Sequence, residues 1–460
     1  MTIYTLLTDL AFASLLILVG QLLRAKIKFI QSSFMPASLL AGFMGLALGA
    51  EFLNWLPFSK GISSYAGMIT VLVFASVGMN GVKFSPGNMK KDLNRMGAYA
   101  SYKVFALTIQ MCLPVAFSMF VVSLLVPDIN NGFGLLLAAG FYGGHGTAAA
   151  LGTTFEKAGW AAATDIGMTF ATIGILAGIF GGLLAIKWAT RNNCTHYVKD
   201  FSDIKDDLKT GLIPQKNRQS MGDETISSVS LDSLAFHFSL ILIPAGLGYL
   251  LNKLIEKTWG LDLPTFTVAF ILAFILFFLL GGVKRNMVYE YVDSRVITRI
   301  GSAATDYLVF FGVASIKLTV VLQYALPLAL LSIFGIALCF FTLFYMGSRM
   351  NNESWFERSI FVFGYATGVF AIGLTLLRIV DPENRSKTLN DTAITGPINT
   401  PLEIFAWASG PAMLLAGGVP AWTFIGIYFG ITLLTVILSK QFKWWYTAPL
   451  DAREAVHEDD

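Results

Sequence analysis

Long blocks of hydrophobic residues follow one another along the chain, separated by short polar segments. Each block is close to the roughly 20 residues that a helix needs to cross a bilayer. The blocks fall at 5–23, 36–54, 66–82, 98–126, 161–186, 233–252, 265–283, 303–322, 326–346, 398–418 and 421–439. Charged residues make up only 13% of the chain, against about 25% in soluble domains. The pattern predicts an all-α polytopic membrane protein.

Two further hydrophobic stretches, 133–152 and 358–376, are interrupted by glycine. The first contains "GFYGGHGTAAALGTT", with five glycines and a histidine inside an apolar run. Glycine weakens a helix, and irregular backbone at membrane depth survives only inside protein or beside a watery cavity. We therefore expect each stretch to enter the membrane, turn at its glycines and return. Tight helix packing through small residues is the alternative for either stretch alone.

Basic residues are distributed unequally between alternate loops. They follow the first, third, seventh and ninth spans, at Arg24, Lys26, Lys28, Lys83, Lys90, Lys91, Arg95, Lys284, Arg285, Arg295, Arg299, Arg349 and Arg358. The other loops are nearly bare. Since cytoplasmic loops carry the excess of Lys and Arg, we expect the N-terminus outside and the long polar stretch 187–230 in the cytoplasm. Lys440 and Lys443 indicate a cytoplasmic C-terminus if the last span is real.

The polar stretch 187–230 has mixed charge and weak periodicity, which is typical of a flexible linker. It divides the chain into a first membrane repeat, 1–186, and a second, 231–440, with a polar tail at 441–460. The halves resemble each other in three places in the same order: "FMPASLLAGF" and "DLPTFTVAF", "LVFASVGMN" and "LVFFGVASI", "YGGHGTAAALGTT" and "FGYATGVFAIGLT".

An odd number of spans in the first half has a consequence for the second. Five full spans carry the chain to the opposite side of the membrane, so the second copy must run upside down. The sequence thus predicts two inverted-topology repeats of about five helices each, with a possible extra C-terminal helix. Secondary transporters use such repeats and place the substrate near the bilayer midplane, between the halves.

The glycine stretches are the candidates for that substrate site. In the first, Gly143, Gly144 and Gly146 permit a turn and a close approach of the backbone. The free N–H groups of the helix that starts near Thr147 would attract a carboxylate. The equivalent second stretch adds Gly364, Thr367 and Gly368 as candidates.

Several of these segments carry a family resemblance. "PASLLAGF", "FASVGMN", "GGHGTAAA", "ATDIGMTFATIGILAGIFGG" and "LPTF" resemble the bacterial sodium/glutamate symporter family over most of the chain. The resemblance implies two inverted five-span domains, a cytoplasmic linker and two re-entrant loops that approach the substrate from opposite sides. It also implies a homodimer in the inner membrane, sodium-coupled glutamate uptake and elevator-type movement. The second loop, "GYATGVFAIGLTLL", lacks the family's histidine, cysteine and proline.

Polar residues inside spans are the candidates for ion binding. Asp165 and Asp306 lie about five residues inside their spans, where carboxylates are rare and are functional hypotheses by default. They could hold cations, carry protons or be solvated near the span end. Ser76, Asn80 and Ser315 offer neutral oxygens that suit sodium. Serines in spans also bond to their own helix.

Other polar residues have two interpretations each. Lys317 is expected to reach the outer interface with its ammonium group, or else to pair with a substrate carboxylate. His145 lacks the partners of a metal site and is expected to bind substrate or stabilise the turn. Pro397 and Pro401 flank Asn399, and we expect the helix to break there. Asn399 and Thr400 are substrate-site candidates, while Glu403 is expected at the interface. The three cysteines Cys112, Cys194 and Cys339 form no paired spacing.

The leading hypothesis is sodium-coupled symport of L-glutamate or a similar small carboxylate, with no cofactor and with sodium as the coupling ion. A proton-coupled carrier of another organic anion or amino acid is the alternative in the same class. A passive channel and a membrane-embedded enzyme are hypotheses of other classes; an enzyme would need converging ligands or a nucleophile with a base. We expect the lipid bilayer, the substrate, sodium and a second copy of the chain as partners, and no nucleic acid.

Overall fold

The computed structural model describes residues 3–59, 61–80, 89–127, 129–197, 209–259, 265–281, 290–351, 353–381, 385–415 and 420–446. All regular secondary structure in these ranges is helical. Eight of the helices there are long and apolar enough to cross a membrane. The expectation of an all-α polytopic membrane protein is therefore confirmed.

The helices before the linker follow the hydrophobic blocks. They are α1 (Ile3–Lys26), α2 (Lys28–Ser33), α3 (Ala37–Leu48), α4 (Ile62–Asn80), α5 (Met89–Phe117), the π-helix η1 (Ser118–Val122), α6 (Ser123–Leu125), α7 (Phe133–Tyr142), α8 (Gly144–Lys157) and α9 (Ala163–Arg191). The short helix α3 begins directly after Pro36, whose fixed backbone angle suits the start of a helix. The break between α7 and α8 falls at Gly143.

The helices after the linker have a similar order of lengths. They are α11 (Ser233–Trp259), α12 (Thr265–Leu279), α14 (Ser294–Ala314), α15 (Leu318–Gln323), α16 (Ala325–Phe340), the π-helix η4 (Phe341–Met346), α17 (Gly347–Met350), α18 (Trp355–Thr367), α19 (Phe370–Val380), α20 (Thr388–Leu415) and α21 (Ala421–Gln441). The linker itself contains the 3-10 helix η3 (Gln215–Asn217). A π-helical segment interrupts the third membrane-length helix on each side of the linker, and a broken helix pair follows it.

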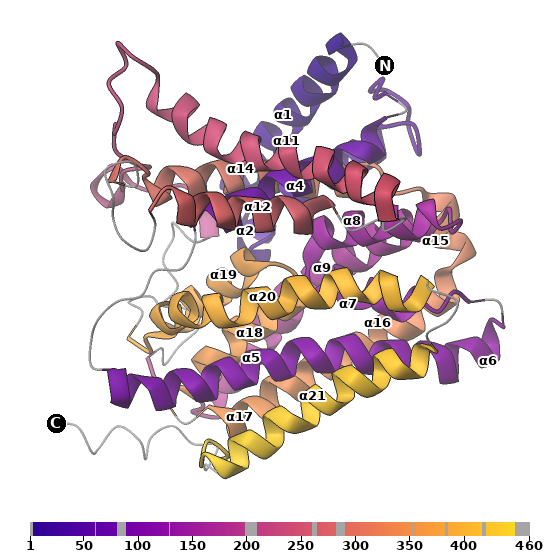
Figure 1. Ribbon diagram of the computed structural model, residues 1–460, viewed down its shortest axis with the longest axis vertical. Helices are drawn as coiled ribbons and strands as arrows, with labels where there is room; N and C mark the ends of the chain where they lie inside the picture. The colour runs from indigo at the N-terminus through magenta and orange to yellow at the C-terminus, as the bar shows by residue number, and fades with distance from the viewer. Residues whose placement is uncertain are drawn as a thin grey trace.

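The helices pack in two layers (Figure 1). One layer, which we call the hairpin layer, contains α5–α9 and α16–α21. The other, the opposing layer, contains α1–α4, α11, α12 and α14. Contacts are dense within each layer, between α5 and α21 or between α4, α12 and α14, and the layers meet chiefly where α8 packs on α4 and α14. Helix α15 connects α14 in one layer to α16 in the other.

Each half of the sequence contributes to both layers. The helices α1–α4 of the first half and α11, α12 and α14 of the second pack together, and the later helices of both halves form the hairpin layer. The largest core cluster joins α5, α7 and α9 to α16, α18 and α19. The packing units therefore differ from the consecutive segments 1–186 and 231–440.

The expected span 303–322 is wrong in its boundaries. Helix α14 begins at Ser294 and ends at Ala314, and a non-helical segment, Ser315–Lys317, separates it from α15. Asp293 caps the start of α14 because its side chain accepts a hydrogen bond from the backbone N–H of Arg295. A hydropathy window misses this start because the first two turns carry Arg295 and Arg299.

The expected helix break near Asn399 is also wrong. Helix α20 begins at Thr388 and continues through Pro397 and Pro401 to Leu415. Proline lacks an N–H and leaves the carbonyl four residues earlier without its helical partner. Helix α20 packs against α5 and α8, and membrane helices tolerate internal proline where neighbours compensate.

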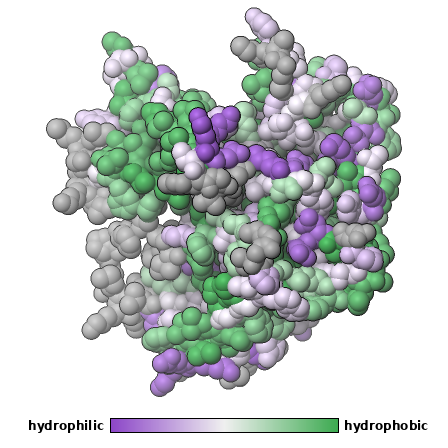
Figure 2. Space-filling view, turned by 45° about the vertical axis from the view of Figure 1, so that its right-hand side comes forward, coloured by the Kyte–Doolittle hydropathy of each residue, from purple (hydrophilic) through white to green (hydrophobic). Residues whose placement is uncertain are grey.

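The surface of the molecule carries much exposed hydrophobic area (Figure 2). Helix α11 illustrates this: its apolar side chains are exposed at Leu234, Phe238, Leu242, Ile243, Leu247, Leu250 and Leu254. Soluble monomers rarely expose contiguous apolar patches of this kind. Such a surface suits the hydrocarbon core of a bilayer, in agreement with the eight long apolar helices.

Candidate functional site

The first broken stretch forms a helical hairpin. Gly132, just before α7, lies against the ring of Phe155 near the end of α8: a Cβ atom on Gly132 would be 2.5 Å from Phe155 Cζ. The two helices therefore run in opposite directions and their outer ends meet. The turn is at Gly143 and Gly144, and Gly144 has a φ of 65°, a left-handed conformation that glycine adopts without strain.

The second broken stretch forms a hairpin as well. A Cβ atom on Gly364 of α18 would be 2.7 Å from the backbone nitrogen of Gly373 in α19, so the two helices pack backbone to backbone. The rings of Phe361 and Phe370 lie 5.4 Å apart across the pair. The turn is at Gly368 and Val369, between the end of α18 and the start of α19.

The two hairpins approach from opposite ends of the long helix α9. The outer end of the first is beside Trp160, three residues before α9 begins: the Phe155 and Trp160 rings are 5.7 Å apart. The outer end of the second is beside the end of α9, where the Glu357 carboxylate accepts hydrogen bonds from the backbone N–H and Nδ1 of His196 at 2.7 and 2.9 Å. At 1.5 Å per residue, α9 is roughly 43 Å long.

The tips of the hairpins meet near the middle of α9. A Cβ atom on Gly144 would be 2.9 Å from the Gly368 carbonyl oxygen and 2.6 Å from Val369 Cγ1. Gly174 of α9 allows the same approach, because a Cβ atom there would be 2.3 Å from the Thr367 carbonyl oxygen. The sequence candidates Gly143, Gly144, Gly368 and Thr367 thus come together in the structure.

Buried polar atoms near the tips have no hydrogen-bond partner among the described residues. They are His145 Nδ1, Thr147 Oγ1 and both amide atoms of Asn399. The other His145 nitrogen lies 3.1 Å from Thr172 Oγ1. Since nearly all buried polar atoms in native proteins are paired, each exception calls for an explanation. A polar ligand or water at the tips would supply the missing partners.

Four residues of the hairpin layer form a charged cluster that our sequence analysis did not predict. The Tyr365 hydroxyl donates to Glu403 Oε2 at 2.8 Å. The Glu403 carboxylate also faces the Tyr142 hydroxyl and the Lys103 ammonium. The Tyr142 and Tyr365 rings are 5.0 Å apart, and Lys103 Nζ lies 5.8 Å from the centre of the Tyr365 ring. Tyr142 is the last residue of α7, so the cluster adjoins the first tip.

The first hairpin also contacts the opposing layer. Thr70 Oγ1 of α4 donates to the Gly146 carbonyl at 3.2 Å. A Cβ atom on Gly312 of α14 would be 2.7 Å from His145 Cδ2. Helix α8 thus lies between the second hairpin's tip and the opposing layer.

The ion-binding candidates do not form one group, although Ser76 and Asn80 lie one turn apart on α4 and both face α14. In the opposing layer, Ser76 Oγ donates to the Val73 carbonyl of its own helix at 2.7 Å, and Asn80 Nδ2 donates to Thr298 Oγ1 at 3.2 Å. Ser315 Oγ donates to the Gly312 carbonyl at 3.4 Å. Asp306 is an exposed residue of α14, a helix of the opposing layer.

The fifth ion-binding candidate, Asp165, forms an ion pair with Lys317 at the start of α15, the helix that connects the layers. Its Oδ2 lies 3.2 Å from Lys317 Nζ, and its Oδ1 accepts from the Lys317 backbone N–H at 3.3 Å. Asp165 is in the first turn of α9, and Lys317 directly precedes α15. The next N–H, of Leu318, donates to Glu51 of the opposing layer at 3.1 Å. Lys317 therefore has a protein carboxylate as its partner.

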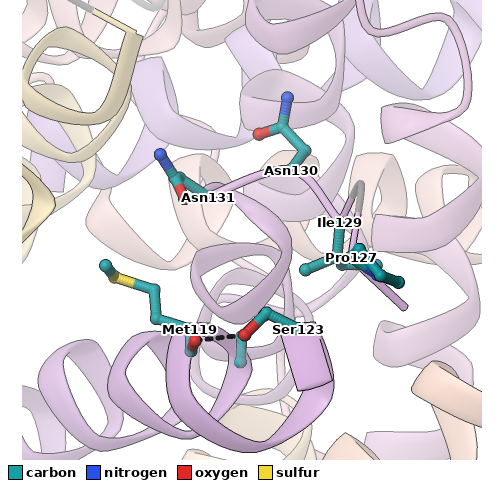
Figure 3. Close-up of a pocket in the computed structure, with 7 residues that line it drawn as sticks. Met119, Ser123, Pro127, Ile129, Asn130 and Asn131 are labelled. Atoms are coloured by element: carbon teal, nitrogen blue, oxygen red, sulfur yellow. Dashed lines mark hydrogen bonds between the residues drawn. The ribbon is translucent and has the colours of Figure 1, made fainter. Parts of the chain in front are cut away.

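A small hollow at the end of the fourth span lies away from these residues (Figure 3). It is lined by Ser118, Met119, Ser123, Pro127, Ile129, Asn130 and Asn131. The side chains are neutral, and Ser123 Oγ donates to the Met119 carbonyl of its own helix. Neither hairpin tip contributes to this hollow.

A comparison with protein families matches residues 2–375 to the sodium/glutamate symporter family. The chain belongs to this family. The match spans both hairpin tips and most of the two layers, and it agrees with the resemblance carried by "GGHGTAAA". A search of curated proteins found no match. As a family member with many apolar helices, the protein is a multi-pass membrane protein and a secondary active transporter.

The family match ends within α19, before α20 and α21. Asn399 and Glu403 are in α20, so they lie outside the matched residues. Lys103, Tyr142 and Tyr365 lie inside the match. The charged cluster therefore combines helices from the matched region with a helix beyond it.

Proposed function

We propose that the protein is a sodium-coupled symporter that carries L-glutamate or a similar small carboxylate across the bacterial inner membrane. The substrate is held where the two hairpin tips meet. The observation that carries this proposal is the contact of Gly144 with Gly368 halfway along α9. The buried Thr147 hydroxyl, which has no partner among the described residues, follows the first tip by three residues and supports the proposal, as does the unpaired amide of Asn399 on α20.

The two hairpins are re-entrant in this proposal, and the halves are inverted repeats. The repeated order of helices on the two sides of the linker supports this, down to the π-helical segments η1 and η4. So does the approach of the hairpins from opposite ends of α9. Inverted repeats give inward-open and outward-open states of similar energy, which alternating access requires.

Elevator-type movement follows from the two layers. The hairpin layer holds both tips and carries the substrate, and it slides along the opposing layer at α8. Small residues on this surface, Gly146 and Gly312, let the layers approach closely. In the proposed orientation the N-terminus is outside, the linker 187–230 is cytoplasmic and the protein is a homodimer.

For sodium, the proposal retains Ser76, Asn80, Asp165, Asp306 and Ser315 as candidates in a state other than the present one. Asp165 has an ammonium partner, Lys317, and Asn80 has Thr298. Movement between the layers would break the first of these contacts and release a carboxylate to a cation.

The test is uptake of labelled L-glutamate by purified protein in liposomes. With an inward sodium gradient we expect accumulation above the outside concentration, and replacing sodium by choline should abolish it. Uptake that persists in choline and follows a proton gradient would instead favour the proton-coupled alternative. Equilibration without accumulation under either gradient would contradict active transport and favour a channel.

A further inference from the structure

The hairpin layer contains two opposite charges that do not pair with each other. Lys103 is only 5% exposed, and its ammonium makes no hydrogen bond or ion pair with the part of the chain that the structure describes. The ammonium lies 5.8 Å from the centre of the Tyr365 ring, and the Glu403 carboxylate is within electrostatic range. A buried charge without hydrogen bonds is costly, and inside a membrane it marks a functional site by default.

The Glu403 carboxylate lies beside the hydroxyl groups of Tyr365 and Tyr142. Tyr365 donates to it at 2.8 Å and the Tyr142 hydroxyl faces it from the first hairpin. A carboxylate has about four acceptor sites, and the Tyr142 hydroxyl donates its hydrogen to the Lys103 backbone carbonyl at 3.4 Å, so Glu403 has room for further donors. The carboxylate lies one helical turn beyond Asn399 on the same face of α20.

Lys103 and Asn399 lie at the same level of two parallel helices. Helices α5 and α20 run in the same direction (Figure 1), with Arg95 bonded to Asp391 at 2.9 Å. Eight residues separate Arg95 from Lys103, and eight separate Asp391 from Asn399. Asn399 is 3% exposed, and neither its amide donor nor its amide acceptor has a partner among the residues that the structure describes. A ligand between α5, α20 and the first tip would therefore meet an ammonium, an amide and a carboxylate.

We propose that Lys103, Asn399 and Glu403 form a subsite for the head group of an α-amino acid. Lys103 binds the carboxylate, Glu403 binds the ammonium, and Asn399 bonds to both through its amide N–H and carbonyl groups. This rests on the proposed transport function and narrows its substrate. A carboxylate without an amine would satisfy Lys103 and meet repulsion from Glu403, whereas the zwitterionic head satisfies both charges.

Binding by purified protein in sodium buffer tests the subsite with matched ligand pairs. Each pair consists of an amino acid and its 2-oxo acid: L-glutamate and 2-oxoglutarate, L-aspartate and oxaloacetate, L-alanine and pyruvate. The half-saturating concentration is read from the rise in thermal stability. We expect the amino acid of the recognised pair to bind about 100-fold or more tightly than its 2-oxo acid, because a site built to bond an N–H rejects the analogue that lacks it.

Variants assign the preference to residues. Glu403→Gln keeps an acceptor for Tyr365 but removes the charge, and we expect the preference to fall to less than about tenfold. Lys103→Gln should weaken the binding of both the amino acid and its 2-oxo acid, because both carry the carboxylate that Lys103 binds. Glu256→Gln, the same change at an exposed position of α11, is the matched control and should leave the ratio unchanged.

Three results would overturn the subsite: equal binding of both members by the unchanged protein, no binding of any member, or an unchanged ratio in Glu403→Gln. If Glu403→Gln does not fold, the ratio in the unchanged protein and the Lys103→Gln variant still decide. Failure of the transport proposal looks different, since sodium-driven accumulation would be absent while the binding ratio persisted. Conversely, if the protein shows sodium-driven uptake but Glu403→Gln binds the amino acid and its 2-oxo acid in the same ratio as the unchanged protein, the subsite is contradicted and the transport proposal is not.

Discussion

Gly144 and Gly368 touch at the tips of two hairpins that reach the middle of α9 from its opposite ends. A Cβ atom on Gly144 would be 2.9 Å from the Gly368 carbonyl oxygen. No other residue fits Gly144 without displacing the second tip or straining its own backbone at a φ of 65°. This contact places the substrate site within the hairpin layer, and the following predictions depend on it.

Gly144→Ala should reduce uptake at least about tenfold, because the added methyl group pushes the tips apart. Strain at positive φ would also destabilise the variant, so it needs a control that shares the strain. Gly159→Ala is that control: its φ is 102°, and nothing lies within 4 Å of its Cβ position. Measured uptake of Gly159→Ala should remain near that of the unchanged protein. Equal losses of uptake in the two variants would show that backbone strain, and not the contact between the tips, causes the effect.

Thr147→Val should lower substrate affinity and leave thermal stability nearly unchanged. Its hydroxyl is buried and has no partner among the described residues, so the substitution removes no protein hydrogen bond. Thr153→Val in the same helix is the control, because Thr153 Oγ1 bonds to the Ala149 carbonyl at 2.8 Å. We expect wild-type uptake from the control. Unchanged affinity in Thr147→Val would mean that the substrate does not use this hydroxyl.

Crosslinking residues 165 and 317 should stop transport. The Asp165–Lys317 ion pair joins α9 of the hairpin layer to the segment that leads out of α14 of the opposing layer, and the Leu318 N–H beside it bonds to Glu51 of the opposing layer. The Lys317 side chain is 53% exposed, so a reagent can reach it. In a cysteine-free background, a bifunctional thiol reagent on the Asp165→Cys, Lys317→Cys protein should abolish uptake, and cleaving the linker should restore it.

The control for crosslinking is a pair inside the hairpin layer. Ser409 and Tyr428 lie in α20 and α21, with their hydroxyl oxygens 2.7 Å apart. Crosslinked Ser409→Cys, Tyr428→Cys protein should still transport, since both helices move as one body. Full uptake after crosslinking residues 165 and 317 would contradict movement between the layers.

The Asp293 carboxylate at the start of α14 should stabilise the folded protein in a pH-dependent way. A hydrogen bond from Arg295 lowers its pKa to about 2, further helped by the Asp223 and Arg295 backbone N–H groups. A lowered pKa means that the charged form stabilises the folded protein above the unfolded value near 3.8 and that this contribution fades as pH falls toward 2. Asp293→Ala also removes a helix cap, worth about 1 kcal/mol.

The thermal stability of Asp293→Ala in detergent should therefore be lower than that of the unchanged protein by a constant amount from pH 8 to about pH 4. The difference should shrink only below that. A difference that changed between pH 5 and pH 8 would assign the titration to another group.

The sequence was sufficient to predict most of the membrane helices and the two glycine-containing breaks, but not the boundaries of α14 or the continuity of α20. Hydropathy marks a span because a helix in lipid must be apolar along its length. Glycine marks a turn at membrane depth because few other residues permit it. The glycines at 143, 144 and 368 are at the turns that the structure has. Which candidates bind substrate and ion stays a prediction.

The charged cluster and the two layers were beyond a reading of the sequence. Lys103, Tyr142, Tyr365 and Glu403 come from four helices, and their proximity depends on which faces pack together. From the sequence alone, we expected Glu403 to lie at the membrane interface. The available signal was a lysine well inside the apolar block 98–126. A charged residue inside an apolar block should first be considered as a possible partner of each other charged residue in the membrane, and only then be assigned to an interface.

Protection of cysteines at both tips tests the central claim most directly. Thr147→Cys and Thr367→Cys are made separately in a cysteine-free protein, with Gly159→Cys as an exposed control. Labelling by a thiol reagent is measured at rising L-glutamate concentration in sodium. We expect the substrate to slow labelling at both tips with the same half-maximal concentration and to leave the control unchanged. Protection of one tip alone, or of neither while uptake persists, would contradict a substrate site shared by the two hairpins.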